Sequence, residues 1–97
     1  ILMTDSDNKE GHSRPTPDVR ELAAALKAAG AAHHEYEQTA LSGVFDEQWP
    51  MFYAAFVLGR LGDFTRPSQL TEWLKAVPTE GAWADAAANY VSESLSI

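Results

Sequence analysis

Cysteine is absent from the 97 residues of the chain. Without a thiol, the protein forms no disulfide bond and has neither a thiolate nucleophile nor a thiolate metal site.

Long apolar runs are also missing. The longest mainly apolar stretch without a charge runs from Trp49 to Gly59, far short of the roughly 20 residues that cross a bilayer as a helix. No targeting segment is recognisable in the sequence. We therefore expect a soluble, cytoplasmic protein that has no membrane partner.

Basic residues are scarce, with seven Lys and Arg against fourteen Asp and Glu and a formal net charge of −7. Proteins that bind nucleic acids or anionic membranes gain much of their affinity from clustered Lys and Arg. Residues 66–91 have the apolar rhythm of a helix-turn-helix. However, the segment 79–97, which would hold the recognition helix, contains three carboxylates and no Lys or Arg. We expect no nucleic-acid partner.

The motifs of common enzymes are missing as well. The sequence Leu41-Ser42-Gly43 is not the G-x-S-x-G motif that presents a nucleophilic serine. Residues 59–64 contain two glycines but lack the lysine and the spacing of a phosphate-binding loop. The sequence therefore favours a protein that is not an enzyme and has no cofactor.

The chain has instead a composition that favours helices. It contains sixteen alanines, and alanine is the best helix former, whereas no alternating run of β-branched and aromatic residues indicates a strand. We predict an all-α fold, either a small four-helix bundle or an orthogonal helical domain, in residues 16–97. A disordered tail is predicted for residues 1–15. The predicted helices cover approximately residues 17–41, 47–61, 67–77 and 80–94.

The first predicted helix has clear end signals. Asp18 and Glu21 fit a capping box just after a possible cap at Thr16, and Gly43 can adopt the left-handed conformation that ends a helix. Gly30 leaves open whether the helix continues or breaks. One face carries an apolar seam with alternating spacings of three and four residues: Val19, Leu22, Leu26, Ala29, His33, Tyr36 and Ala40.

The second predicted helix is apolar nearly all round, because Arg60 is its only charge beyond the first turn. Such a helix is typical of a buried position, so we expect it to be central and packed by all the others. Asp46 is expected to cap it. The small residues Ala55 and Gly59 would let a neighbouring helix approach closely.

The last two helices are predicted to begin at polar caps and to present an apolar face to the core. The expected caps are Thr65 or Ser68 for the third helix and Thr79 for the fourth. The residues expected to face inward are Leu70, Trp73, Leu74, Val77, Trp83, Ala86, Ala87, Tyr90 and Val91.

Histidine and carboxylates gather where the first two helices meet. His33 lies on the apolar seam, Glu37 follows one turn later, and Asp46 lies just beyond the turn. These three residues are the candidate ligands if a metal is bound, and His33 with a carboxylate could also act as an acid–base pair. The structural interpretation is the stronger one, with no metal and a polar cluster that fixes the angle between two helices. The candidate ligand-binding residues are His33, Tyr36, Glu37, Asp46, Trp49 and Tyr53.

The same region resembles a pattern of short uncharacterised bacterial helical proteins. The pattern has a histidine, a Tyr-Glu pair, a glycine in the turn, an Asp-x-x-Trp-Pro sequence, and then an aromatic pair followed by alanine. The matching residues are His33, Tyr36, Glu37, Gly43, Asp46, Trp49, Pro50, Phe52, Tyr53 and Ala54. The resemblance implies no activity, and Phe52 stands where the pattern has tryptophan.

Two functions follow from these observations as hypotheses. The first is a small acidic protein–protein interaction or assembly module, for which self-association as a homodimer is one version. Its basis is a surplus of large apolar side chains, with Phe45 and Phe64 expected to leave apolar surface exposed. The alternative is a small-ligand or metal-binding protein that uses the polar corner between the first two helices.

Overall fold

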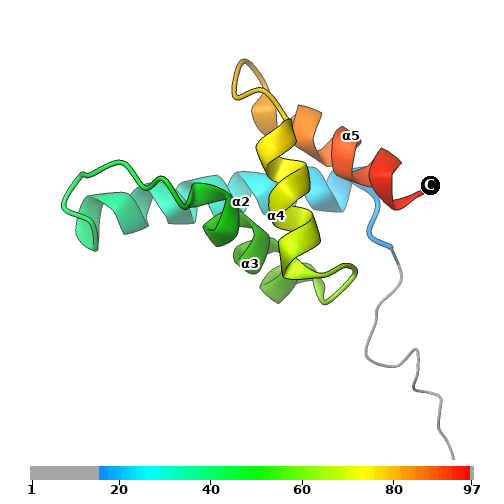
Figure 1. Cartoon of the computed structure of the whole chain (residues 1–97), viewed down its shortest axis with the longest axis horizontal. Coiled ribbons are helices and arrows are strands. Elements are labelled where there is room, and N and C mark those ends of the chain that lie inside the picture. Colours follow the sequence, from blue (N-terminus) through cyan, green and yellow to red (C-terminus); the bar gives the residue numbers. More distant parts are fainter. Residues whose placement is uncertain (1–15, 97) are drawn as a thin grey trace, which may run out of the picture.

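The computed structural model describes residues 16–96, which form four helices and no strand (Figure 1). The predicted all-α fold is therefore confirmed, whereas the tail predicted for residues 1–15 lies outside the described residues. The helices are α2 (Val19–Thr39), α3 (Trp49–Leu61), α4 (Pro67–Ala76) and α5 (Trp83–Leu95). None of the four has both the length and the hydropathy to cross a membrane.

The helices pack in a closed ring in which each one contacts two others. Helix α2 packs against α3 and α5, and α4 packs against the same two helices. Helix α4 runs across the direction of α2, as an orthogonal arrangement requires (Figure 1). The prediction that the second helix is central is therefore wrong, because α3 packs on α2 and α4 alone and leaves one side exposed.

The exposed side of α3 carries small and apolar residues, which is why the composition of this helix wrongly predicted a central position. Met51, Ala55, Gly59 and Arg60 all face solvent, and a Cβ built on Gly59 would meet no atom within 4 Å. No described helix packs closely on Gly59, contrary to expectation, whereas Ala55 lines a shallow groove with Pro67 and Thr71 of α4. An apolar sequence shows that a helix is buried somewhere, but it does not show how many neighbours bury it.

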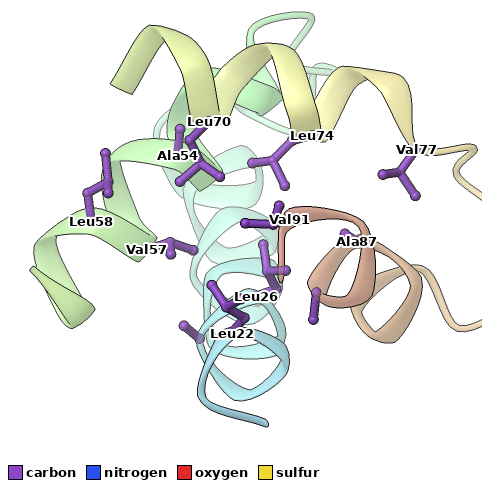
Figure 2. Close-up of a cluster of buried hydrophobic side chains, with 12 residues drawn as sticks. Leu22, Leu26, Ala54, Val57, Leu58, Leu70, Leu74, Val77, Ala87 and Val91 are labelled. Atoms are coloured by element: carbon purple, nitrogen blue, oxygen red, sulfur yellow. The ribbon is translucent and has the colours of Figure 1, made fainter. Parts of the chain in front are cut away.

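The core lies where the four helices converge, and it is built from leucines and valines set against alanines (Figure 2). Alanines at 0–1 % exposure on α2, α3 and α5 let these helices approach closely, and the branched side chains fill the space between them. The buried cluster comprises Leu22, Ala25, Leu26, Ala54, Val57, Leu58, Leu70, Leu74, Val77, Ala87, Ala88 and Val91.

The residues predicted to face the core are buried in the middle of each helix face but partly exposed at its margins. On α2 the seam is buried from Leu22 to His33, but Val19 and Tyr36 are more than one-third exposed. On α5 the face is rotated by about one position, since Ala88 is buried whereas Ala86 and Tyr90 are exposed. Trp73 is half-buried and packs against the core. Phe64 does the same, so the exposed apolar surface predicted there is wrong.

Only one of the predicted helix caps is formed as expected. Asp18 Oδ1 accepts a hydrogen bond from the Glu21 N–H at 2.8 Å, and Glu21 Oε1 accepts one from the Asp18 N–H at 3.0 Å. This capping box starts α2 at Asp18 rather than at Thr16. It fixes the end of α2 farthest from the corner with α3.

The other three helices begin without a side-chain cap, at Gln48, Arg66 and Ala82. The caps predicted at Asp46, at Thr65 or Ser68 and at Thr79 are therefore wrong. A proline in the first turn of α3 and of α4 removes one N–H that a cap would satisfy. Helix α5 starts later than predicted because the chain first turns at Gly81, whose φ is 57°.

Leu74 provides a direct test of this core because its side chain is fully buried on α4. We expect Leu74→Ala to lower the free energy of unfolding by about 2–5 kcal/mol, since the change leaves a cavity in a close-packed interior. Urea unfolding followed by circular dichroism measures this value.

The matched control is Met51→Ala, which truncates a side chain that is 56 % exposed on α3. Its effect should stay within about 0.5 kcal/mol. Equal losses for the two variants would show that the core is not where the structure places it.

Candidate functional site

A buried histidine connects α2 to the loop that precedes α3. His33 is only 7 % exposed, and its Nε2 atom lies 2.9 Å from Asp46 Oδ2. These residues are thirteen positions apart, so their hydrogen bond closes the turn between the two helices. The sequence brought His33 and Asp46 together as candidates, and the structure places them in direct contact.

Asp46 makes two further hydrogen bonds that fix its position. Its backbone N–H donates to Glu37 Oε2 at 2.9 Å, and its Oδ1 atom accepts from the Gln48 N–H at 2.9 Å. The second contact is a local turn just before α3, which explains why Asp46 does not cap the helix itself. Glu37 Oε2 also lies 4.0 Å from His33 Nε2, so both carboxylates lie near the imidazole.

The loop between the helices is held by backbone hydrogen bonds as well. Ser42 and Gly43 have φ values of 55° and 83°, which confirms the left-handed turn predicted at Gly43. The Gly43 N–H donates to the Glu37 carbonyl oxygen at 2.7 Å, and the Val44 N–H donates to the Leu41 carbonyl oxygen at 3.0 Å. The chain therefore leaves α2 in a defined direction toward Asp46.

The hydrogen bond from His33 lowers the pKa of Asp46 below its ordinary value. Burial opposes this shift because it disfavours a carboxylate. The Gln48 N–H and the positive charge of His33 in its protonated form lower the pKa further. Asp46 is therefore ionised at neutral pH and remains an acceptor for both groups.

Aromatic rings also pack against His33. Its ring lies 4.9 Å from Phe52 in an edge-to-face arrangement and 5.4 Å from Tyr53, measured between centroids. Tyr36 packs on Phe52 at 5.2 Å but is 37 % exposed. The imidazole is thus held between carboxylates and rings, and Tyr36 covers the outer edge of this cluster.

A second ring cluster joins α3 to the start of α5. Trp49, Tyr53 and Trp83 each lie 5.4 Å from the other two, with interplanar angles of 79°, 82° and 90°. The indole N–H of Trp83 donates to the Val77 carbonyl oxygen at 3.3 Å, which fixes the orientation of this ring. These contacts connect two helices whose backbones lie too far apart to pack directly.

A pocket of about 380 Å³ opens between the polar corner and this ring cluster. Its lining combines one carboxylate, one imidazole and the Thr79 hydroxyl with four aromatic rings, one of which, Tyr53, carries a second hydroxyl. The lining residues are His33, Glu37, Phe45, Trp49, Tyr53, Thr79 and Trp83. Such a mixture of apolar walls and a few polar groups is typical of ligand sites.

Four of the six predicted ligand-binding residues line this pocket, and two do not. His33, Glu37, Trp49 and Tyr53 contribute to its wall. Asp46 does not line the pocket but forms a hydrogen bond with His33. Tyr36 also lies outside the pocket, where its ring packs against Phe52. Trp83 was predicted to face inward but was not predicted to line this site. No pattern in the neighbouring sequence indicates that its ring would reach Trp49 and Tyr53 on α3.

The corner does not have the geometry of a metal site. Within residues 16–96, no group of three or more His, Asp or Glu side chains could hold a metal ion. The nearest set is His33, Glu37 and Asp46, the three residues that the sequence singled out as candidate ligands. In that set Glu37 is 4.0 Å from the imidazole nitrogen and already accepts the Asp46 N–H.

Tyr53 connects the pocket to α2 through a close approach at Gly30. A Cβ atom built on Gly30 would lie 3.2 Å from the Tyr53 hydroxyl oxygen, so the missing side chain leaves room for the phenol. Helix α2 continues through this glycine without a break, which settles the question left open by the sequence. Burial raises the pKa of Tyr53, and the negative charge of Glu37 raises it further.

Comparisons with protein-family models, with curated proteins and with solved structures found no match to this chain. No activity is therefore carried over from a relative. The resemblance of residues 33–54 to bacterial helical proteins stays a prediction, and function must be argued from the geometry of the corner.

The lowered pKa of Asp46 predicts a specific acid sensitivity. Because the folded state holds this carboxylate ionised more strongly than the unfolded chain does, its contribution to stability is present above about pH 4. It is lost as the pH falls through the lower pKa of the folded state. Asp46→Asn should therefore unfold more easily at pH 7 and show a smaller decrease in stability between pH 5 and pH 2.5. Urea unfolding across this pH range measures both effects.

The control for this experiment is Asp63→Asn, which removes one carboxylate from an exposed loop position. It changes the net charge by the same amount and should retain the acid sensitivity of the wild type. Identical pH profiles for Asp46→Asn and the wild type would contradict the role assigned to the His33–Asp46 hydrogen bond.

The two helical glycines predict opposite responses to alanine. Gly59→Ala should raise the free energy of unfolding by about 0.5–1 kcal/mol, because alanine favours helix and the site is open. Gly30→Ala should gain clearly less or be destabilising, because its Cβ would press on the Tyr53 hydroxyl. In a Tyr53→Phe background the nearest atom would be a ring carbon at 4.0 Å, and the gain at position 30 should approach that at position 59. Equal gains at both positions in the wild type would rule out the close approach.

Proposed function

We propose that the chain is a small protein–protein interaction module that binds its partner through the loop between α2 and α3. The observation that carries this proposal is the exposure of Val44 and Phe45, which are 65 % and 68 % accessible to solvent. No other large apolar side chain in residues 16–96 is as exposed. Adjacent exposed apolar residues are typical of surfaces that a partner covers.

The hydrogen bonds around this loop support a binding role. The Val44 N–H is bonded to the Leu41 carbonyl oxygen, and the residue after Phe45 is held by both Glu37 and His33. The two apolar side chains therefore project from a backbone that is already ordered. A preorganised surface loses less conformational entropy on binding, so more of the apolar burial contributes to affinity.

The partner can be a second copy of the chain or a different protein, and the two cases are distinguished by experiment. Phe45 also lines the pocket beside His33 and Trp49. The exposed loop and the pocket are thus parts of one surface, which we call the corner surface and define by Val44, Phe45 and the pocket-lining residues. Large aromatic residues in such a position often dominate binding energy.

A second candidate function is the binding of a small ligand in the pocket itself. The specific observation in its favour is the volume of about 380 Å³, with Glu37, His33 and Thr79 placed among aromatic walls. This volume lies within the range of small-molecule sites. In this case Phe45 would act as one wall of the ligand site rather than as a contact for a partner.

The interaction role predicts a site-specific cross-link. A photoreactive residue introduced at position 45 in the intact chain should form one defined adduct in cells, whereas the same residue at the exposed Asn89 on α5 should not. Mass spectrometry identifies the adduct as a second copy or as another protein. Sedimentation at several concentrations checks for self-association independently.

The affinity of the identified partner provides the quantitative test. The double change Val44→Ser and Phe45→Ser should weaken binding about tenfold or more, since it removes the two apolar contacts. Met51→Ser, which alters an exposed apolar residue outside the corner surface, should bind normally. Equal affinities for the two variants, or equal adducts from positions 45 and 89, would overturn the proposal.

A further inference from the structure

Three of the four aromatic rings that line the pocket stand nearly at right angles to one another. Trp49, Tyr53 and Trp83 are each 5.4 Å apart between centroids, and all three line the same cavity. The faces of aromatic rings carry partial negative charge and attract cations that lie within about 6 Å of the centroid. Several aromatic rings around one cavity are the arrangement by which proteins recognise methylated ammonium groups.

The charges around the cavity also favour a cation. Glu37 contributes a carboxylate to the lining, and its side chain keeps 20 % of its surface exposed. The lining contains no Lys or Arg, and its one imidazole, on His33, has its Nε2 atom bonded to the ionised Asp46. The whole chain has a net charge of −7, which raises the local concentration of positive ligands.

The other groups of the cavity fit an ammonium ion that carries an alkyl chain. Phe45 and the rings offer apolar contact to methyl and methylene groups, whereas Thr79 and Glu37 offer oxygen atoms to N–H or hydroxyl groups. A small inorganic cation would be held poorly, because Glu37 is the only carboxylate in the lining. An anion would meet this carboxylate and the negative faces of the rings.

We propose that the pocket binds an alkylammonium group, with the charged nitrogen over the rings of Trp49, Tyr53 and Trp83 and facing the carboxylate of Glu37. This inference rests on the proposed binding role of the corner surface and names the chemistry that this surface recognises. The same group occurs on free methylated amines and on the lysine side chain of a protein. The experiment distinguishes these two sources.

The test uses the three tryptophans of the intact chain as reporters. Choline and its neutral isostere 3,3-dimethylbutanol are titrated separately while the indole N–H signals are followed by nuclear magnetic resonance. Choline should shift the signals of Trp49 and Trp83 in a saturable way. The signal of Trp73, which lies on α4 outside the pocket, should not move.

The neutral isostere decides whether charge matters. It should bind about fivefold or more weakly than choline, because it has the same shape without the charge that the rings and Glu37 attract. Equal affinity of the two compounds would overturn the proposal, and so would the absence of a saturable shift with choline and with blocked derivatives of trimethyllysine and lysine. This comparison uses the wild-type chain and therefore does not depend on whether a variant folds.

Two matched variants test the residues that hold the cation. Glu37→Gln should weaken choline binding severalfold, whereas Glu35→Gln, which removes the same charge from an exposed position of α2, should bind like the wild type. Equal weakening in both would show attraction by net charge alone and would contradict a site at Glu37. Trp83→Leu should lower affinity about fivefold to thirtyfold, whereas Trp73→Leu should leave it unchanged.

The source of the ammonium group is found by comparing choline with a blocked trimethyllysine and a blocked unmodified lysine. Tighter binding of either lysine derivative supports the proposal and identifies a protein side chain as the ligand, and tighter binding of choline supports it and identifies a free amine. A failure of all three ligands would overturn the cation site alone. The cross-link at position 45 is measured without them, so the interaction role is judged separately.

Discussion

The hydrogen bond between His33 and Asp46 is the contact on which the corner of this protein depends. It is formed by a nearly buried imidazole on α2 and a carboxylate that lies outside any helix. Because Asp46 is also held by Glu37 and by the Gln48 N–H, three interactions meet at one residue. Together they determine where the chain re-enters as α3, and thus where Trp49 and Tyr53 lie relative to α2.

The same contact explains why His33 is a positioning residue in the candidate site. Its Nε2 atom is occupied by Asp46, and its ring is packed against Phe52 and Tyr53. An imidazole so constrained forms a fixed wall of the pocket. The other polar groups of the pocket are the carboxylate of Glu37 and the hydroxyls of Tyr53 and Thr79, and its remaining walls are aromatic rings.

Sequence patterns identified the parts of this structure that depend on local spacing. The seam from Leu22 to His33, the capping box of α2 and the proximity of His33 to Asp46 follow from helical periodicity and from a short turn. The position of α3 could not be found in this way, because its composition does not reveal that it has two helical neighbours rather than three. Trp83 was missed as a pocket residue for a related reason, since it reaches Trp49 only after the ring of helices has closed.

The placement of the pocket relative to the core has a physical consequence. The last turns of α2 extend past the other helices (Figure 1), and the buried residues of α2 end at His33. Beyond this point the helix is supported by the loop and by aromatic contacts instead of by the leucine core. Tyr53 connects the two regions, because it lies against Gly30 on the core side and against His33 and Trp83 on the pocket side. Because Phe45 of the exposed loop and Tyr53 both line the pocket, the proposed ligand would contact the loop and the ring that packs on Gly30 at the same time.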